Sequence, residues 1–372
     1  MNDIENILAT KLQYRLCRKS IHLLPSIQSI VKECCETLGI KKPTILFCES
    51  ITKDFQAFDL KNKKFFIYDS GLMEILYLYN CIAFTNFIEN DMDKFFYKLF
   101  GEEFILQMDI LNSMYFVGKY NDRQFSFEQN VLDNSKVRKY LSIQNYFLIG
   151  HELTHLSLKE DSKIPNEYKK FVIAAIALLT ERIVDKNKDI QEVLLETATY
   201  FLDTSPNSIE EYIEMLKCSN KFYHFLEECY CDYMGLKLLI EHYENAEQSI
   251  RAIVSTLSCL IILESIRNDV RDGIEYIKDG TRNADLAMYC SVLRTQILLC
   301  TVEISRLNTA AAFDEVHKFS KITDRLISFI KNLPSKDSFA VISEDDLPQM
   351  DEETTLNIMI KQLYYISISP EF

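Results

Sequence analysis

The sequence is poor in the residues that loosen or break regular structure, with only 8 glycines and 7 prolines in 372 residues. Disordered and low-complexity chains are rich in those residues, so extended disorder is not expected. No cluster of lysine and arginine is long enough to form a basic stripe, and the formal net charge is -14. Such a chain is poorly suited to binding nucleic acid or anionic lipid, and a protein or peptide partner fits it better.

The sequence also gives no indication of a secretion signal, a membrane span or a set of paired cysteines. The N-terminal residues MNDIENILATKLQ are polar and charged, unlike a signal peptide. The longest apolar runs, Phe171–Leu179 and Ala252–Leu263, are shorter than the roughly 17–25 residues that cross a bilayer. The 11 cysteines are odd in number and scattered, which favours free thiols packed as small hydrophobic side chains. These features predict a cytoplasmic protein and give no oligomeric state.

Apolar spacing predicts an α+β fold that is predominantly α-helical, with a small N-terminal β-sheet. Short apolar runs at 44–48, 55–60 and 64–68 predict three strands, after a long helix over 3–39. Spacings of three and four residues recur from 137 to 333 and predict helices almost throughout. The sheet should therefore precede a helical body.

The pentapeptide HELTH at 151–155 carries the strongest chemical signal. Residues four apart share a helix face, so the imidazoles of His151 and His155 can bind one metal ion. Glu152 lies about 100° around the helix from His151, where its carboxylate reaches a water on that metal. Apolar neighbours predict a mostly buried helix, in which these polar groups would be costly without a metal. The motif therefore predicts a zinc site with its own general base.

A third ligand is offered by the run Glu228-Cys229-Tyr230-Cys231-Asp232, inside the helical stretch 222–243. Glu228 and Asp232 are four residues apart and share a helix face, although an acidic pair on a solvated face has the same spacing. Two imidazoles and one carboxylate leave Zn²⁺ a net positive charge and an open fourth position. Such a centre acidifies a water and polarises a carbonyl, while Glu152 moves the proton to the leaving amine.

HELTH followed by EECYCDYMGLKLL resembles the gluzincin metallopeptidases, especially soluble members of the prenyl-protease and heat-shock-protease branch. The second motif of that branch is E-x-x-x-D, then a small residue and a Leu-rich helix, as in Glu228, Asp232, Gly235 and Leu236–Leu239. A more distant resemblance is to phage-exclusion proteases.

The N-terminal segment resembles the same branch. There a strand, an N/Q-A-F turn and an S/T-G-L helix start precede the zinc helix, as Gln56-Ala57-Phe58 and Ser70-Gly71-Leu72 do here. The resemblance covers about 45–80 and 140–240. Between these parts lies a segment much longer than is usual in the family.

The resemblance implies a zincin-like helical core in which His151, His155 and Glu228 bind Zn²⁺ and Glu152 is the general base. It also implies that Asp232 hydrogen-bonds His151 and fixes its tautomer. The N-terminal strands would offer an edge for an extended substrate. The expected function is a zinc-dependent endopeptidase acting on a protein substrate, in a regulated or defence-related role. The alternative is a zinc-binding pseudoenzyme or helical interaction scaffold, against which the intact Glu152 argues.

The group that stabilises the oxyanion is not assigned by the sequence. Arg294 matches the arginine of the family's late H-P-x-x-x-x-R signature, but Met288 and Tyr289 stand in place of His-Pro. His224, four residues before Glu228, is either an assistant to the tetrahedral intermediate or a surface or packing histidine. Weaker candidates are Tyr223, Tyr289, Arg282 and Arg294. The remaining histidines without an acidic partner at ligand spacing are interpreted as structural: His22, His242 and His317.

These features divide the chain into five segments. They are 1–80, the N-terminal helix and sheet; 81–139, an insertion of uncertain structure with candidate strands at 115–118 and 124–127; 140–245, the zinc-binding helical core; 246–335, a C-terminal helical region; and 336–372, an acidic linker and tail.

Overall fold

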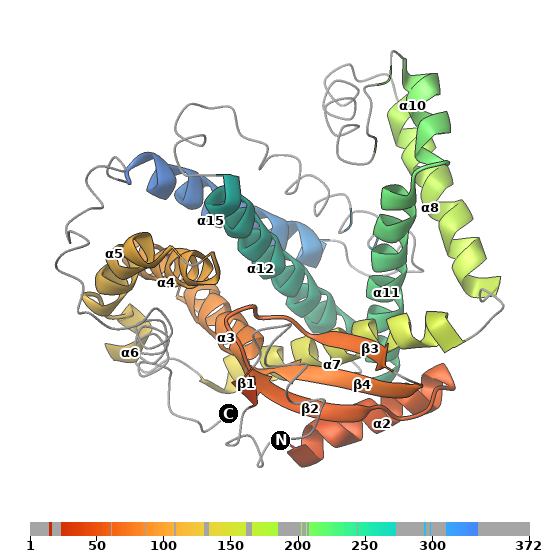
Figure 1. Ribbon diagram of the computed structural model, residues 1–372, viewed down its shortest axis with the longest axis horizontal. Coiled ribbons are helices and arrows are strands. Elements are labelled where there is room, and N and C mark those ends of the chain that lie inside the picture. Colours follow the sequence, from red (N-terminus) through yellow and green to blue (C-terminus); the bar gives the residue numbers. More distant parts are fainter. Residues whose placement is uncertain are drawn as a thin grey trace.

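The computed structural model has the predominantly helical α+β fold that the sequence predicts (Figure 1). It describes residues 15–16, 24–60, 62–85, 87–107, 109–129, 134–160, 166–184, 208–243, 245–272 and 310–333, and the single residues 202, 206, 294 and 298.

A small sheet has the strand order β1-β2-β4-β3. β1 (Arg15–Leu16) is antiparallel to β2 (Thr44–Glu49), β2 is parallel to β4 (Lys63–Asp69), and β4 is antiparallel to β3 (Gln56–Leu60). The three predicted strands are therefore confirmed. Asn62, with a φ of 63°, lies in the turn that joins β3 to β4. β3 is the outer strand on its side of the sheet.

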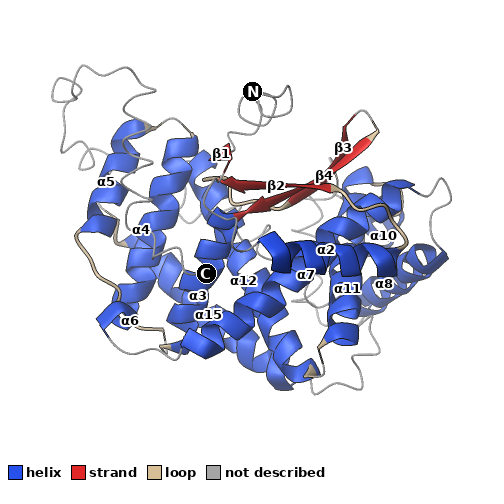
Figure 2. Ribbon diagram, turned by 90° about the horizontal axis from the view of Figure 1, so that it is seen from below, coloured by secondary structure: helices blue, strands red, loops and turns tan. Residues whose placement is uncertain are grey.

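Helices cover one face of this sheet, with α2 and α7 running beneath the strands in Figure 2. The helices are α2 (Leu24–Leu38), α3 (Ser70–Phe84), α4 (Glu89–Leu106), α5 (Ile110–Asn121), α6 (Ser126–Gln129), α7 (Asn134–Glu160), α8 (Asn166–Val184), α10 (Ile209–Leu216), α11 (Asn220–His242), α12 (Ala246–Asp272) and α15 (Ala310–Lys331). α7 is central, because it contacts β3, β4, α2, α3, α11 and α12.

The described residues form three hydrophobic clusters, a small one within the sheet and two that hold the helices together. The larger joins the sheet to α2, α3, α4, α5, α7, α12 and α15 and includes Leu236, Leu238 and Leu239 of α11. The smaller joins α8, α10 and α11 around Phe222 and Tyr230. The N-terminal half of α11 therefore packs in the smaller cluster and its C-terminal half in the larger one. Its N-terminus is capped by Ser219, whose hydroxyl accepts a hydrogen bond from the Phe222 amide.

Three predicted elements differ from the structure. Among the described residues of the helix predicted over 3–39, Leu24–Leu38 forms α2, whereas Arg15–Leu16 forms β1, which pairs with the edge of β2. The candidate strands at 115–118 and 124–127 are replaced by α5 and α6. Aromatic density is typical of strands, but the spacing of Phe116, Val117 and Tyr120 buries one helix face, and packing decides the outcome.

The long apolar helix α12 belongs to the core. Its segment Ala246–Arg271 is long and apolar enough to cross a bilayer, and 83% of its most apolar window is buried inside the structure. The core helix of a globular protein has the same properties.

The cysteines agree with the prediction of unpaired thiols as far as they are described. Eight are described; none forms a disulfide and seven are buried. Parts of the stretch predicted as helical, 185–201 and 273–309, lie outside the described residues apart from the single residues 294 and 298, and so does the acidic linker and tail at 336–372.

Candidate metal centre

Two glycines set the approach of α7 to α11. A Cβ on Gly235 would lie 2.9 Å from the carbonyl oxygen of Phe147 and 3.2 Å from the backbone nitrogen of His151. A Cβ on Gly150 would lie 3.3 Å from the Gly235 Cα. Backbone meets backbone here, so a larger residue would push the helices apart. The close crossing lets short carboxylate side chains on α11 reach the histidines on α7.

Gly235→Ala is expected to lower the free energy of unfolding of the metal-free protein by about 1–3 kcal/mol, because the rigid Phe147 carbonyl cannot move away from a new methyl group. Gly118→Ala in α5 is the matched control, since a Cβ there meets nothing within 4 Å. The control should gain stability, by up to about 1 kcal/mol, from helix propensity alone. Urea unfolding measures both, and equal effects in the two variants would contradict the close crossing.

The predicted ligand atoms converge at this crossing. The Nε2 atoms of His151 and His155 lie 3.4 Å and 3.2 Å from the two carboxylate oxygens of Glu228. His151, Glu152 and His155 also offer ligand atoms that all lie within 4.8 Å of one another. Ligands at about 2.1 Å around a tetrahedral Zn²⁺ are separated by about 3.4 Å. The donor set of two imidazoles and one carboxylate therefore fits a zinc ion.

Each histidine has a carboxylate behind it. His151 Nδ1 lies 2.9 Å from Asp232 Oδ1, and His155 Nδ1 lies 2.9 Å from Glu227 Oε1. A carboxylate on Nδ1 leaves Nε2 as the metal-binding atom and holds the ring in place. The contact of Asp232 is the one that the family resemblance implies, whereas the contact of Glu227 is not predicted by it.

Arg294 contacts two of the carboxylates at this site, those of Asp232 and Glu228. Its guanidinium donates to both carboxylate oxygens of Asp232, with a distance of 2.8 Å from Nη2 to Oδ1. The same Nη2 lies 3.3 Å from Glu228. Burial alone would raise the pKa of Asp232, but Arg294 and His151 hold it below its usual value. Arg294 is thus engaged by the carboxylates of α11, so it acts on their charge and position.

Glu152 is placed between the ligands and the sheet. Its Oε1 lies 3.9 Å from His151 Nε2, while its Oε2 accepts a hydrogen bond of 3.0 Å from the Ala57 amide of β3. Burial raises the pKa of the Glu152 carboxyl above its ordinary value. A carboxylate with a raised pKa is better able to hold a proton between two steps of a reaction.

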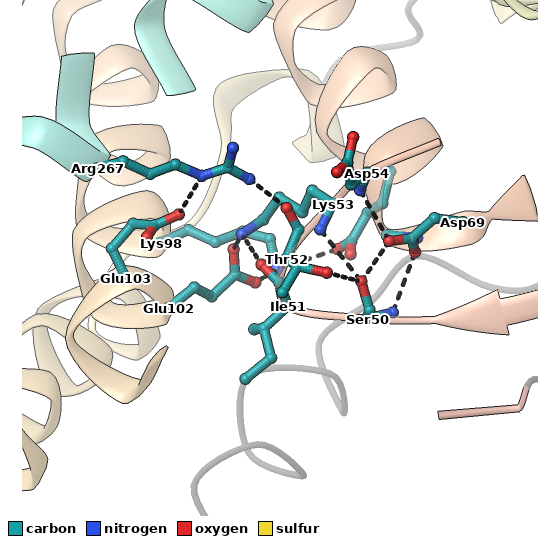
Figure 3. A network of polar contacts seen from close by, with 12 residues as sticks. Ser50, Ile51, Thr52, Lys53, Asp54, Asp69, Lys98, Glu102, Glu103 and Arg267 are labelled. Atoms are coloured by element: carbon teal, nitrogen blue, oxygen red, sulfur yellow. Dashed lines mark hydrogen bonds and ion pairs between the residues drawn. The ribbon is translucent and has the colours of Figure 1, made fainter. Parts of the chain in front are cut away.

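The loop that leads into β3 is held by a buried carboxylate, Asp69 (Figure 3). Asp69 accepts hydrogen bonds from the amides of Ser50, Asp54 and Gly71, at 3.0, 3.0 and 2.8 Å. A Cβ on Gly71 would lie 2.3 Å from the Ser50 carbonyl oxygen, so this approach requires glycine. The start of α3 and the loop before β3 are therefore fixed by one side chain.

The same loop is fixed from the other side by α4, in the 81–139 segment, and by α12. Lys53, itself buried, lies 2.6 Å from Glu102 of α4. Arg267 of α12 donates to the Thr52 carbonyl oxygen and lies 3.2 Å from Glu103 (Figure 3). Charges this deeply buried are tolerated only in well-paired geometry, so the network specifies one position for the loop. In that position, the Ala57 amide can donate its hydrogen bond to Glu152.

Zinc uptake is expected to release about two protons per ion near neutral pH. Burial disfavours the charged imidazoles, but Asp232 and Glu228 outweigh it at His151, and Glu227 and Glu228 at His155, raising the pKa of each to about 10. Both rings then carry a proton that competes with the metal, and zinc affinity should rise as the pH rises toward about 10. Calorimetry in buffers of different protonation enthalpy counts the protons. Release of none would contradict the described pairing.

The other sequence candidates are placed away from the ligands or are not described. His224 is exposed on α11 and close enough to Glu227 to lower its pKa, and no described contact brings it to the ligand atoms. Tyr223 is also exposed. His242 pairs with Glu33 and stacks on Tyr146, in keeping with a structural role. His22, Arg282, Met288 and Tyr289 lie outside the described residues, and His317 is exposed on α15.

Sequence reasoning missed Glu227 and the loop network. Glu227 directly precedes Glu228 in α11, and its position beside this predicted ligand is the only sequence feature that could have indicated it. The loop network joins residues far apart in the chain, for which no spacing rule exists.

The geometry thus brings together three side chains that could hold a metal ion, a carboxylate beside them and an edge strand that contacts this carboxylate. Such a site can hold a divalent metal ion and move a proton next to it. Comparisons with protein-family models, curated proteins and solved structures find no match for this chain.

Proposed function

We propose that this protein is a zinc-dependent metallopeptidase of the gluzincin type, which hydrolyses a protein or peptide substrate. The observation that supports it most directly is the convergence of His151, His155 and Glu228, with the Glu152 carboxylate beside them. A purely structural zinc site has four protein ligands and no base. A three-ligand site with an adjacent carboxylate is typical of hydrolysis.

In this proposal, His151, His155 and Glu228 would hold Zn²⁺, which would act as a Lewis acid and lower the pKa of a water. Glu152 would accept a proton from the attacking water and later give it to the leaving amine. Asp232 and Arg294 keep His151 and Glu228 in place. The contacts of Glu152 with His151, of His151 with Asp232, and of Arg294 with Asp232 and Glu228 support these roles.

Substrate is proposed to bind along β3, extended and antiparallel or parallel to it. β3 is the outermost strand beside β4, and its Ala57 amide already points at Glu152. An extended peptide adds to such an edge through backbone hydrogen bonds, which favour a polypeptide over a small molecule. The buried loop network before β3 keeps this edge from shifting.

The proposal is tested by metal analysis combined with hydrolysis of fluorescently labelled casein. About one zinc ion per chain is expected after purification without chelator, with hydrolysis lost in chelator and restored by added zinc. Zinc at this ratio without hydrolysis of casein or of a broad peptide library would favour the zinc-binding scaffold. Absence of zinc would rule out the metal centre.

A further inference from the structure

We propose that Glu227 is a positioning residue of the metal centre, which fixes His155 as an Nε2 donor and strengthens zinc binding. The inference rests on the proposed metal centre but not on peptidase activity. Glu227 is not a member of the ligand set, and its role follows from its contact with the ring of His155.

The ring of His155 lies between two consecutive glutamates. Its Nδ1 is 2.9 Å from Glu227 Oε1, and its Nε2 is 3.2 Å from Glu228 Oε1. Neighbouring residues on a helix point about 100° apart, which lets the two carboxylates reach opposite edges of the same ring. Glu227 therefore occupies the edge that faces away from the ligands, and Glu228 the edge that faces them.

The contact has the geometry of the other carboxylate–histidine pair at this site. His151 and Asp232 are also 2.9 Å apart through Nδ1, so both zinc histidines are held in the same way by carboxylates of α11. A carboxylate that accepts a hydrogen bond from Nδ1 makes the imidazole a stronger ligand.

The two pairs differ in their surroundings. Asp232 is fully buried and is held by Arg294, whereas the side chain of Glu227 is 30% exposed. Removal of Glu227 should therefore leave no charge stranded in the core and should disturb the fold little. Its effect is expected mainly on metal binding, where loss of such a partner typically costs about 10–100-fold in affinity.

The test compares zinc dissociation constants of the full-length wild type, Glu227→Ala, Glu227→Gln and Glu241→Ala, measured by competition with a chelator. Glu241 is an exposed glutamate near the other end of α11 and serves as the matched control. Glu227→Ala should bind zinc about 10–100-fold more weakly, and Glu227→Gln, whose amide oxygen still accepts from Nδ1, should recover part of the loss. Glu241→Ala should match the wild type.

A second measurement separates positioning from general damage. The absorption spectrum of the Co²⁺-substituted protein reports ligand geometry, and it should change in Glu227→Ala while the metal-free variant still unfolds in one cooperative transition. A zinc affinity of Glu227→Ala within about twofold of the wild type, with an unchanged Co²⁺ spectrum, would overturn the role of Glu227. A wild type that binds no zinc would instead overturn the metal centre itself.

Discussion

Glu152→Gln is expected to lower hydrolysis by about 10²–10⁴-fold while zinc content and the free energy of unfolding remain those of the wild type. An amide of the same size cannot accept the proton of the attacking water. It can still accept the hydrogen bond from the Ala57 amide, through its oxygen, so the side chain should stay in place. The loss should therefore appear in the rate and not in the fold.

The measurement pairs casein hydrolysis with zinc analysis of the same samples, and Glu214→Gln serves as control. Glu214 is an exposed glutamate on α10 paired with Lys217, so its neutralisation should change neither quantity. Full activity of Glu152→Gln would show that another group removes the proton. Loss of zinc together with activity would instead make Glu152 a ligand, and the proposed mechanism would be wrong.

The core of the site could be predicted because its information is local. Four residues along a helix bring His151 and His155 to one face, and the same spacing aligns Glu228 with Asp232. Placing these two motifs on helices therefore fixes most of the geometry, and their meeting then needs only the crossing of α7 and α11. Gly235, which permits that crossing, was visible only as a small residue after the second motif.

The contacts around the site could not be predicted because they join distant parts of the chain. Arg294 matched a family signature, but its contact with Asp232 joins residues 62 apart in the sequence, for which no helix spacing rule exists. Lys53 and Glu102 form an ion pair in the protein interior. No sequence pattern distinguishes a buried lysine from a lysine on the surface.

The structure of the segment 81–139 could not be predicted from the sequence either. Its aromatic residues indicated strands, but in α4 and α5 they stack on each other, as Phe100 and Phe104 do on Phe116. α4 also supplies Glu102 and Glu103 to the loop before β3. The segment therefore takes part in positioning the edge of the site, and this could be learned only from three-dimensional contacts.

Asp232→Ala is expected to have the largest effect on stability, lowering the free energy of unfolding by about 3 kcal/mol. Asp232 is fully buried and accepts from both Arg294 and His151, so its removal leaves an imidazole without its Nδ1 partner and a guanidinium with only the 3.3 Å contact to Glu228. The side chain of Arg294 is 23% exposed, and this places the cost at the lower end of the range for breaking a buried pair.

The double variant Asp232→Ala/Arg294→Met separates stability from metal binding. Removing both charged partners leaves no stranded guanidinium, so most of the lost stability should return. Zinc affinity should not return, because His151 still lacks the acceptor that orients its ring. Urea unfolding of the metal-free proteins and chelator competition measure the two quantities independently. If the double variant is as unstable as Asp232→Ala, the loss of stability does not come from the unpaired Arg294. If the double variant recovers its zinc affinity, Asp232 does not position His151.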